Sequence, residues 1–84
     1  MTADTLAFHA AAPGGGEGYV LLLERAGADG QVRWREWSSE DYMAPAREGT
    51  SDAGEIADRV EGWARAGWAL SESVHRITGW LRPR

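Results

Sequence analysis

The residues best suited to molecular recognition lie together in one short segment, Arg33-Trp34-Arg35-Glu36-Trp37. In an extended strand, successive side chains point to opposite faces, so Arg33, Arg35 and Trp37 share one face. Two guanidinium groups beside an indole are typical of two kinds of binding site. Trp and Arg dominate the hot spots of protein interfaces, and single-stranded nucleic acids stack on aromatic and Arg side chains of open sheets. The segment therefore predicts a binding surface.

Three interpretations of this surface follow from its neighbours in the sequence. In a purely structural one, Trp37 is covered by Tyr42 and Met43, and the arginines pair with Glu24 or Glu17 across a hairpin. In the other two, the surface binds a protein or a single-stranded nucleic acid. The net charge of −4 opposes a phosphate-rich ligand, so a protein partner is favoured and nucleic acid is the alternative. The predicted interface residues are Arg33, Arg35, Trp37 and Tyr42.

Catalytic chemistry has little support in the sequence. His9 and His75 have no second His or Cys at ligand spacing, so we expect no metal site. Ser73 and His75 are two residues apart and would share a face if their segment were a strand, but such pairs occur by chance in most proteins. The run of glycines at 14–16 lacks the Lys and Ser or Thr of a phosphate-binding loop. We expect no catalytic residues and no cofactor, and therefore no enzyme.

Length and composition limit the architecture. A chain of 84 residues has room for one domain, and the absence of cysteine excludes a disulfide framework. The longest apolar run covers residues 19–23, far short of the ~20 residues of a membrane span. No Lys or Arg precedes Arg25, so the N-terminus does not resemble a secretory signal. We expect a cytoplasmic protein with no membrane partner.

The predicted binding segment belongs to a β-hairpin. Residues 19–25 are typical of a buried strand, and residues 31–38 alternate between apolar and polar side chains. Gly30 lies between them and supplies the positive φ of a tight turn. Residues 5–10 alternate weakly and fit either a short strand or a mobile tail. Residues 38–51 contain few apolar side chains and predict a polar loop.

A helix over residues 52–66 has well-marked ends. Asp52 is its expected N-cap, and Gly67 its expected C′ residue. Ile56, Val60 and Trp63 form one apolar stripe that predicts contact with the sheet. Two further predictions concern this helix: Trp68 contacts Trp63 in a Schellman motif, and Gly62 allows the helix to approach the sheet closely.

The segment from residue 68 to residue 81 fits two patterns. Leu70, Val74, Ile77 and Leu81 recur with helical spacing after a Ser71 cap, whereas Trp68, Leu70 and Val74 alternate as in a strand. A two-stranded sheet is marginal alone. We therefore predict a third strand of the sheet, ending at Gly79.

The combined prediction is an α+β fold, a small antiparallel sheet of three or four strands with a β-β-α-β core packed on one helix. Residues 1–18 would be a flexible segment with an optional short strand, residues 19–81 the domain, and residues 82–84 a tail. By size and composition, such an acidic, tryptophan-rich domain is typical of bacterial, phage or mobile-element proteins that act as accessory subunits, adaptors or inhibitors. A homodimer that buries some of the five tryptophans is an alternative partner.

Overall fold

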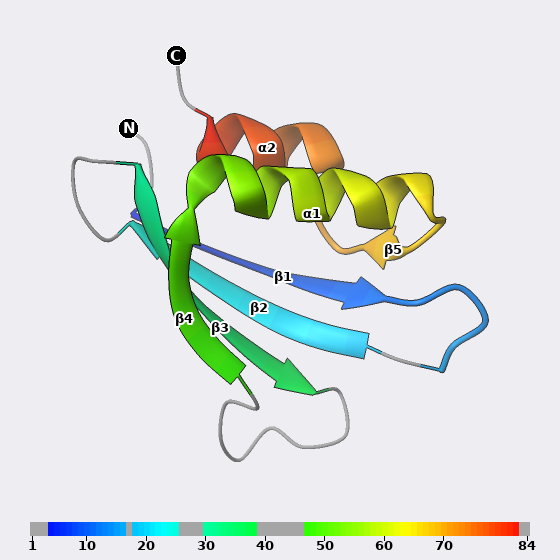
Figure 1. Ribbon diagram of the computed structural model, residues 1–84. Helices are drawn as coiled ribbons and strands as arrows, with labels where there is room; N and C mark the ends of the chain where they lie inside the picture. Colours follow the sequence, from blue (N-terminus) through cyan, green and yellow to red (C-terminus); the bar gives the residue numbers. More distant parts are fainter. Residues whose placement is uncertain (1–3, 17, 26–29, 39–46, 83–84) are drawn as a thin grey trace.

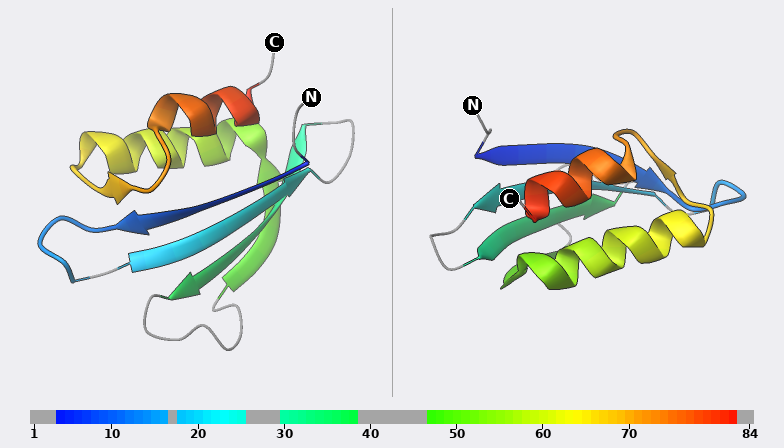
Figure 2. Two further views of the ribbon diagram at one scale, coloured as in Figure 1. Left: turned by 180° about the vertical axis from the view of Figure 1, so that it is seen from behind. Right: turned by 90° about the horizontal axis from the view of Figure 1, so that it is seen from above.

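The computed structural model describes residues 4–16, 18–25, 30–38 and 47–82, which form one five-stranded antiparallel sheet and two helices. Both helices lie on the same face of the sheet (Figures 1 and 2). None of the helices in this part of the chain is long and apolar enough to cross a membrane. The elements in chain order are β1 (Thr5–Ala11), β2 (Gly18–Arg25), β3 (Gln31–Ser38), β4 (Arg47–Asp52), α1 (Ala53–Arg65), β5 (Ala69–Leu70) and α2 (Val74–Leu81).

The α+β class is confirmed, and the sheet is larger than predicted. Its strand order is β4-β3-β2-β1-β5, so the predicted three or four strands become five and the single helix becomes two. The predicted hairpin is confirmed as β2 and β3, with Leu21 opposite Glu36 in the register. Gly30 has φ +82°, as its turn position requires. The hairpin therefore forms the middle of the sheet.

The N-terminal segment forms a full strand, which resolves the choice between strand and tail. β1 pairs with β2 from Thr5 to Ala11, and β5 pairs on its other side. Phe8 and Ala10 belong to the core. The expected flexible segment of residues 1–18 thus contains, in its described part, one of the inner strands of the sheet.

The prediction of a loop over residues 38–51 is wrong at its C-terminal end, because Arg47–Asp52 forms the edge strand β4. This strand has no large apolar side chain, so hydrophobic periodicity does not reveal it. Gly49 lies under the indole of Trp34, whose Cζ2 would be 2.9 Å from a Cβ at that position. The close packing of β3 on β4 therefore depends on this glycine. Residues 39–46 lie outside the described residues.

The predicted helix is confirmed at both ends. The Asp52 side chain accepts a hydrogen bond from the Gly54 amide (3.3 Å). After α1, the Trp68 N–H donates to the Trp63 carbonyl at 3.0 Å, and Gly67 has φ +89°. The indoles of Trp63 and Trp68 stack with centroids 5.4 Å apart, so the predicted Schellman contact is present.

The buried stripe of α1 is also confirmed, with one difference. Ile56 and Val60 are buried, while Trp63 is half-buried. The prediction for Gly62 is wrong, because a Cβ at this position would have no neighbour within 4 Å. Gly62 does not bring the helix close to the sheet.

The prediction of a strand that ends at Gly79 is wrong. Only Ala69–Leu70 pairs with β1, and the chain then forms the helix α2. Ser73, rather than Ser71, caps this helix by accepting a hydrogen bond from the Arg76 amide (3.2 Å). The helix buries Ile77, Trp80 and Leu81. The helical periodicity seen in the sequence therefore prevails over the alternating pattern, because α2 completes the cover of the sheet.

Candidate functional site

The helices leave one face of the sheet without a covering element among the described residues (Figure 2). We call this the open face. Its side chains alternate with the core positions Phe8, Leu21, Leu23 and Val32 along the strands. The open face comprises Ala7, His9, Val20, Leu22, Glu24, Arg33, Arg35, Trp37, Glu48 and Thr50.

Apolar side chains form a patch on the open face along β2 and at the C-terminal end of β3. Val20 lies directly opposite Trp37, and Leu22 lies between Ala7 of β1 and Arg35 of β3. Val20, Leu22 and Trp37 are each only half-buried. Strands β2 and β3 thus present a connected apolar patch on this face, which ends at Trp37 beyond the pairing with β4.

Ion pairs surround the apolar patch on the β3 side. Arg33 lies opposite Glu24, with Nη1 and Oε1 3.9 Å apart, and Arg35 lies opposite Glu48, with Nε and Oε2 3.8 Å apart. All four side chains are between 42% and 66% exposed, so each pair contributes little to stability. The two arginines are therefore balanced by two carboxylates on the same face.

The structure brings together three of the four predicted interface residues. Arg33, Arg35 and Trp37 share the open face, as the alternation of β3 requires. Tyr42 lies outside the described residues. The structural interpretation is confirmed for the pair of Arg33 with Glu24. The pair of Arg35 with Glu48 was missed because β4 was expected to be a loop.

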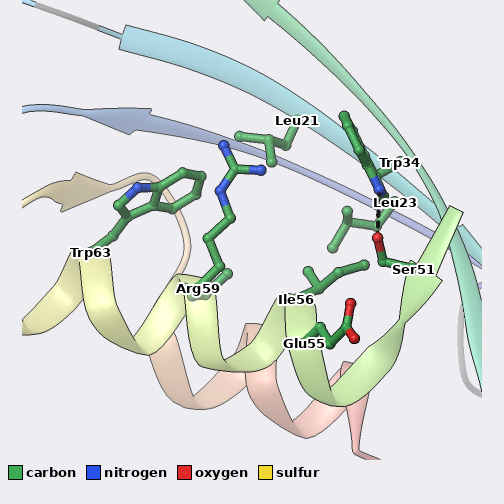
Figure 3. A pocket seen from close by; sticks show the side chains of 9 residues that line it. Leu21, Leu23, Trp34, Ser51, Glu55, Ile56, Arg59 and Trp63 are labelled. Carbon is green, nitrogen blue, oxygen red and sulfur yellow. Dashed lines mark hydrogen bonds between the residues drawn. The ribbon is translucent and has the colours of Figure 1, made fainter. Parts of the chain in front are cut away.

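A second site lies on the covered face, in a cavity of about 230 Å³ between α1 and strands β2, β3 and β4 (Figure 3). At one end, Arg59 donates to the carboxylate of Glu36 at 2.6 Å and stacks over the ring of Trp63 with 4.6 Å to the centroid. Glu36 is 1% exposed. The cavity was not predicted from the sequence. Its one signal there is Glu36, an acidic residue on the same strand face as Val32 and Trp34, because a buried carboxylate needs a cationic partner.

The remaining candidates for chemistry do not converge. Ser73 is the N-cap of α2, and His75 is exposed on that helix, so the two do not share a strand face. His9 is exposed on the open face. Within residues 4–16, 18–25, 30–38 and 47–82, no group of three or more His, Cys, Asp or Glu side chains is placed to hold a metal ion.

Comparison with known proteins gives no relative from which a function can be transferred. No protein-family model, curated protein or solved structure matches this chain. A functional assignment therefore depends on the chemistry of the two surfaces described above.

Proposed function

We propose that this protein is a small non-catalytic module that binds another protein through the open face, as an accessory subunit, adaptor or inhibitor. The apolar patch of Val20, Leu22 and Trp37 is the observation that carries this proposal, because it lies on a sheet face that no described element covers. Connected apolar patches with a polar rim are a property of interaction sites. Trp37 is the expected hot spot, since Trp is among the residue types that dominate interface hot spots and its indole is the largest side chain of the patch.

The charges of the open face favour a protein partner over a nucleic acid. A ligand rich in phosphate requires guanidinium groups that are free to neutralise its phosphates, which releases the counterions condensed on the ligand. Here Arg33 and Arg35 each face a carboxylate, from Glu24 and Glu48. A protein surface with charges of both signs fits this rim, because each loose pair can exchange its partner for an opposite charge on the other molecule.

The proposal is tested by site-specific photo-crosslinking in the native host. A benzophenone amino acid at His9 lies at the rim of the open face, while the same group at Arg65 lies on α1, on the other side of the sheet. We expect a defined protein adduct from position 9 and none from position 65. Trp37→Ala should abolish the adduct and weaken binding of the purified partner about 30-fold, the effect of a hot spot worth about 2 kcal/mol.

Two further measurements decide between the partner classes. Sedimentation of the purified protein, with and without Trp37→Ala, shows whether the partner is a second copy of this chain. Titration with mixed-sequence single-stranded oligonucleotides at low and moderate salt tests the alternative. Micromolar binding that decreases steeply with salt and is weakened by Arg33→Ala would replace the protein partner with a nucleic acid.

A further inference from the structure

The cavity on the covered face has a shape that suits a small ligand. Leu21 and Leu23 of β2 form its back, and Ile56 and Val60 of α1 close it from the helix side. The indole of Trp34 forms one wall. The Trp34 Nε1–H donates to the hydroxyl of Ser51 at 3.0 Å, which fixes the plane of this wall (Figure 3).

The volume of the cavity limits the size of its ligand. At about 230 Å³ it is smaller than the roughly 300–1,000 Å³ of sites for drug-sized molecules. It therefore suits one ring with a short chain. The partly exposed indole wall and the Ile56 side chain favour a flat, apolar body.

The charged side chains around the cavity favour a cation. Arg59 is neutralised by the buried carboxylate of Glu36 and covered on one side by Trp63. Glu55 also lines the cavity, on the side of Ser51, and has no ion-pair partner among the described residues. Of the two charged residues that line the cavity, Arg59 is paired with Glu36 outside the lining, so the Glu55 carboxylate is the charge that remains for a ligand. The indole of Trp34 adds a face that attracts cations.

We propose that this cavity is a binding site for a small organic cation, an amine on an aromatic body. The ring lies in the mouth of the cavity, against Ile56 and the face of the Trp34 indole, and the ammonium group lies beside the exposed Glu55 carboxylate. The site is on the opposite side of the sheet from the open face, so this inference does not depend on the proposed protein partner.

Three probes of similar shape and different charge test the inference: 2-phenylethylamine, 2-phenylethanol and phenylacetate. Binding is followed by the five indole N–H signals in ¹H–¹⁵N NMR spectra of the intact protein. We expect the amine to shift the signals of Trp34 and Trp63 saturably, with a Kd of about 1 mM, while Trp37 on the open face is unchanged. The amine should bind about tenfold more tightly than the alcohol, and the phenylacetate more weakly than either.

A matched pair of variants tests whether Glu55 causes the preference for the amine over the alcohol. Glu55→Gln should reduce the preference for the amine over the alcohol from about tenfold to about twofold or less. Asp58→Asn changes the net charge equally on the same helix but does not line the cavity, so it should leave the preference intact. The inference is overturned if the amine gives no saturable shift of Trp34 by 10 mM (roughly ten times the expected Kd), or if Glu55→Gln leaves the preference unchanged. Tighter binding of phenylacetate would overturn it as well and would indicate Arg59 as the recognising group.

Discussion

Trp34 and Trp37 lie on the same strand, three residues apart, and have opposite environments. Trp34 faces the helices, lies over Gly49 and donates a hydrogen bond to Ser51. Trp37 lies on the open face opposite Val20, where no described element covers the strand. Residue type therefore does not determine whether a tryptophan of β3 packs against other elements or lies on the open face. The difference comes from the elements that cover each face of the sheet.

The ion pairs of the two faces differ in the same way. On the covered face, Arg59 contacts Glu36 at 2.6 Å, and the carboxylate is almost completely buried. On the open face, Arg33 and Glu24 are 3.9 Å apart and about half exposed. The first pair holds α1 on the sheet, because a buried charge without its partner is strongly unfavourable. The second pair is weak and exposed, so it could rearrange at little cost on binding of the proposed partner.

The largest expected difference between the faces comes from one charge placed on each. Val60 of α1 is fully buried, so Val60→Asp places an unpaired carboxylate in the core, at a cost of several kcal/mol against a total stability of about 5–15 kcal/mol. We expect this variant to be unfolded at 25 °C by circular dichroism. Val20→Asp on the open face should lower the free energy of unfolding by only about 1 kcal/mol. A cooperative thermal transition of Val60→Asp close to that of the wild type would show that α1 does not pack on the sheet as described.

The next largest effect concerns the two kinds of ion pair. Arg59→Ala leaves the Glu36 carboxylate buried without a cation, and we expect a loss of about 3 kcal/mol in urea unfolding. Arg35→Ala removes an exposed pair with Glu48 and should cost less than about 1 kcal/mol. Adding Glu36→Met to Arg59→Ala should restore part of the loss, because the uncompensated charge is then absent. Equal costs for the two single variants would contradict the distinction between the faces.

Most of the central sheet and α1 were predictable from local sequence, for physical reasons. The turn at Gly30, the alternation of β3 and the two caps of α1 each depend on interactions between residues close in the sequence. A short stretch of sequence therefore suffices to predict them. β4 was not predictable, because an edge strand such as Arg47–Asp52 is defined by its pairing with β3 and not by a buried face. α2 was misassigned because its choice between two periodicities depends on packing against α1 and the sheet, which no local pattern contains.

The binding surfaces were predictable to a smaller extent. The alternation of β3 placed Arg33, Arg35 and Trp37 on one face, but the balancing carboxylate of Glu48 required β4. The cavity required α1 and three strands to be assembled first, so Glu55 and Trp34 had no reason to be associated in the sequence. Local patterns thus indicate which residues share a face, whereas tertiary structure decides which faces are covered.

A smaller change in the free energy of unfolding is expected when either of two glycines is replaced by alanine, and the first of these variants tests the packing of Trp34 on β4. Gly49→Ala would place a Cβ 2.9 Å from the Trp34 ring, which is held by Ser51, so we expect a loss of about 1–2 kcal/mol. Gly62→Ala lies within α1 with open space around it, and should instead raise the free energy of unfolding by about 0.5–1 kcal/mol. Thermal unfolding of both variants measures the difference. Stabilisation by Gly49→Ala would mean that the indole does not lie over β4.

The smallest expected effect is the coupling between Glu24 and Arg33, measured by a double-mutant cycle with alanine at each position. Because both side chains are about half exposed and their charged atoms are 3.9 Å apart, the coupling free energy should be at most about 0.5 kcal/mol and should decrease with added salt. A coupling above about 1 kcal/mol would make this pair a structural feature of the sheet, comparable with Arg59 and Glu36. A weak coupling means that the guanidinium of Arg33 can leave Glu24 at little cost. In the proposed complex, Arg33 would then be free to pair with a carboxylate of the partner, while the apolar patch would supply most of the affinity.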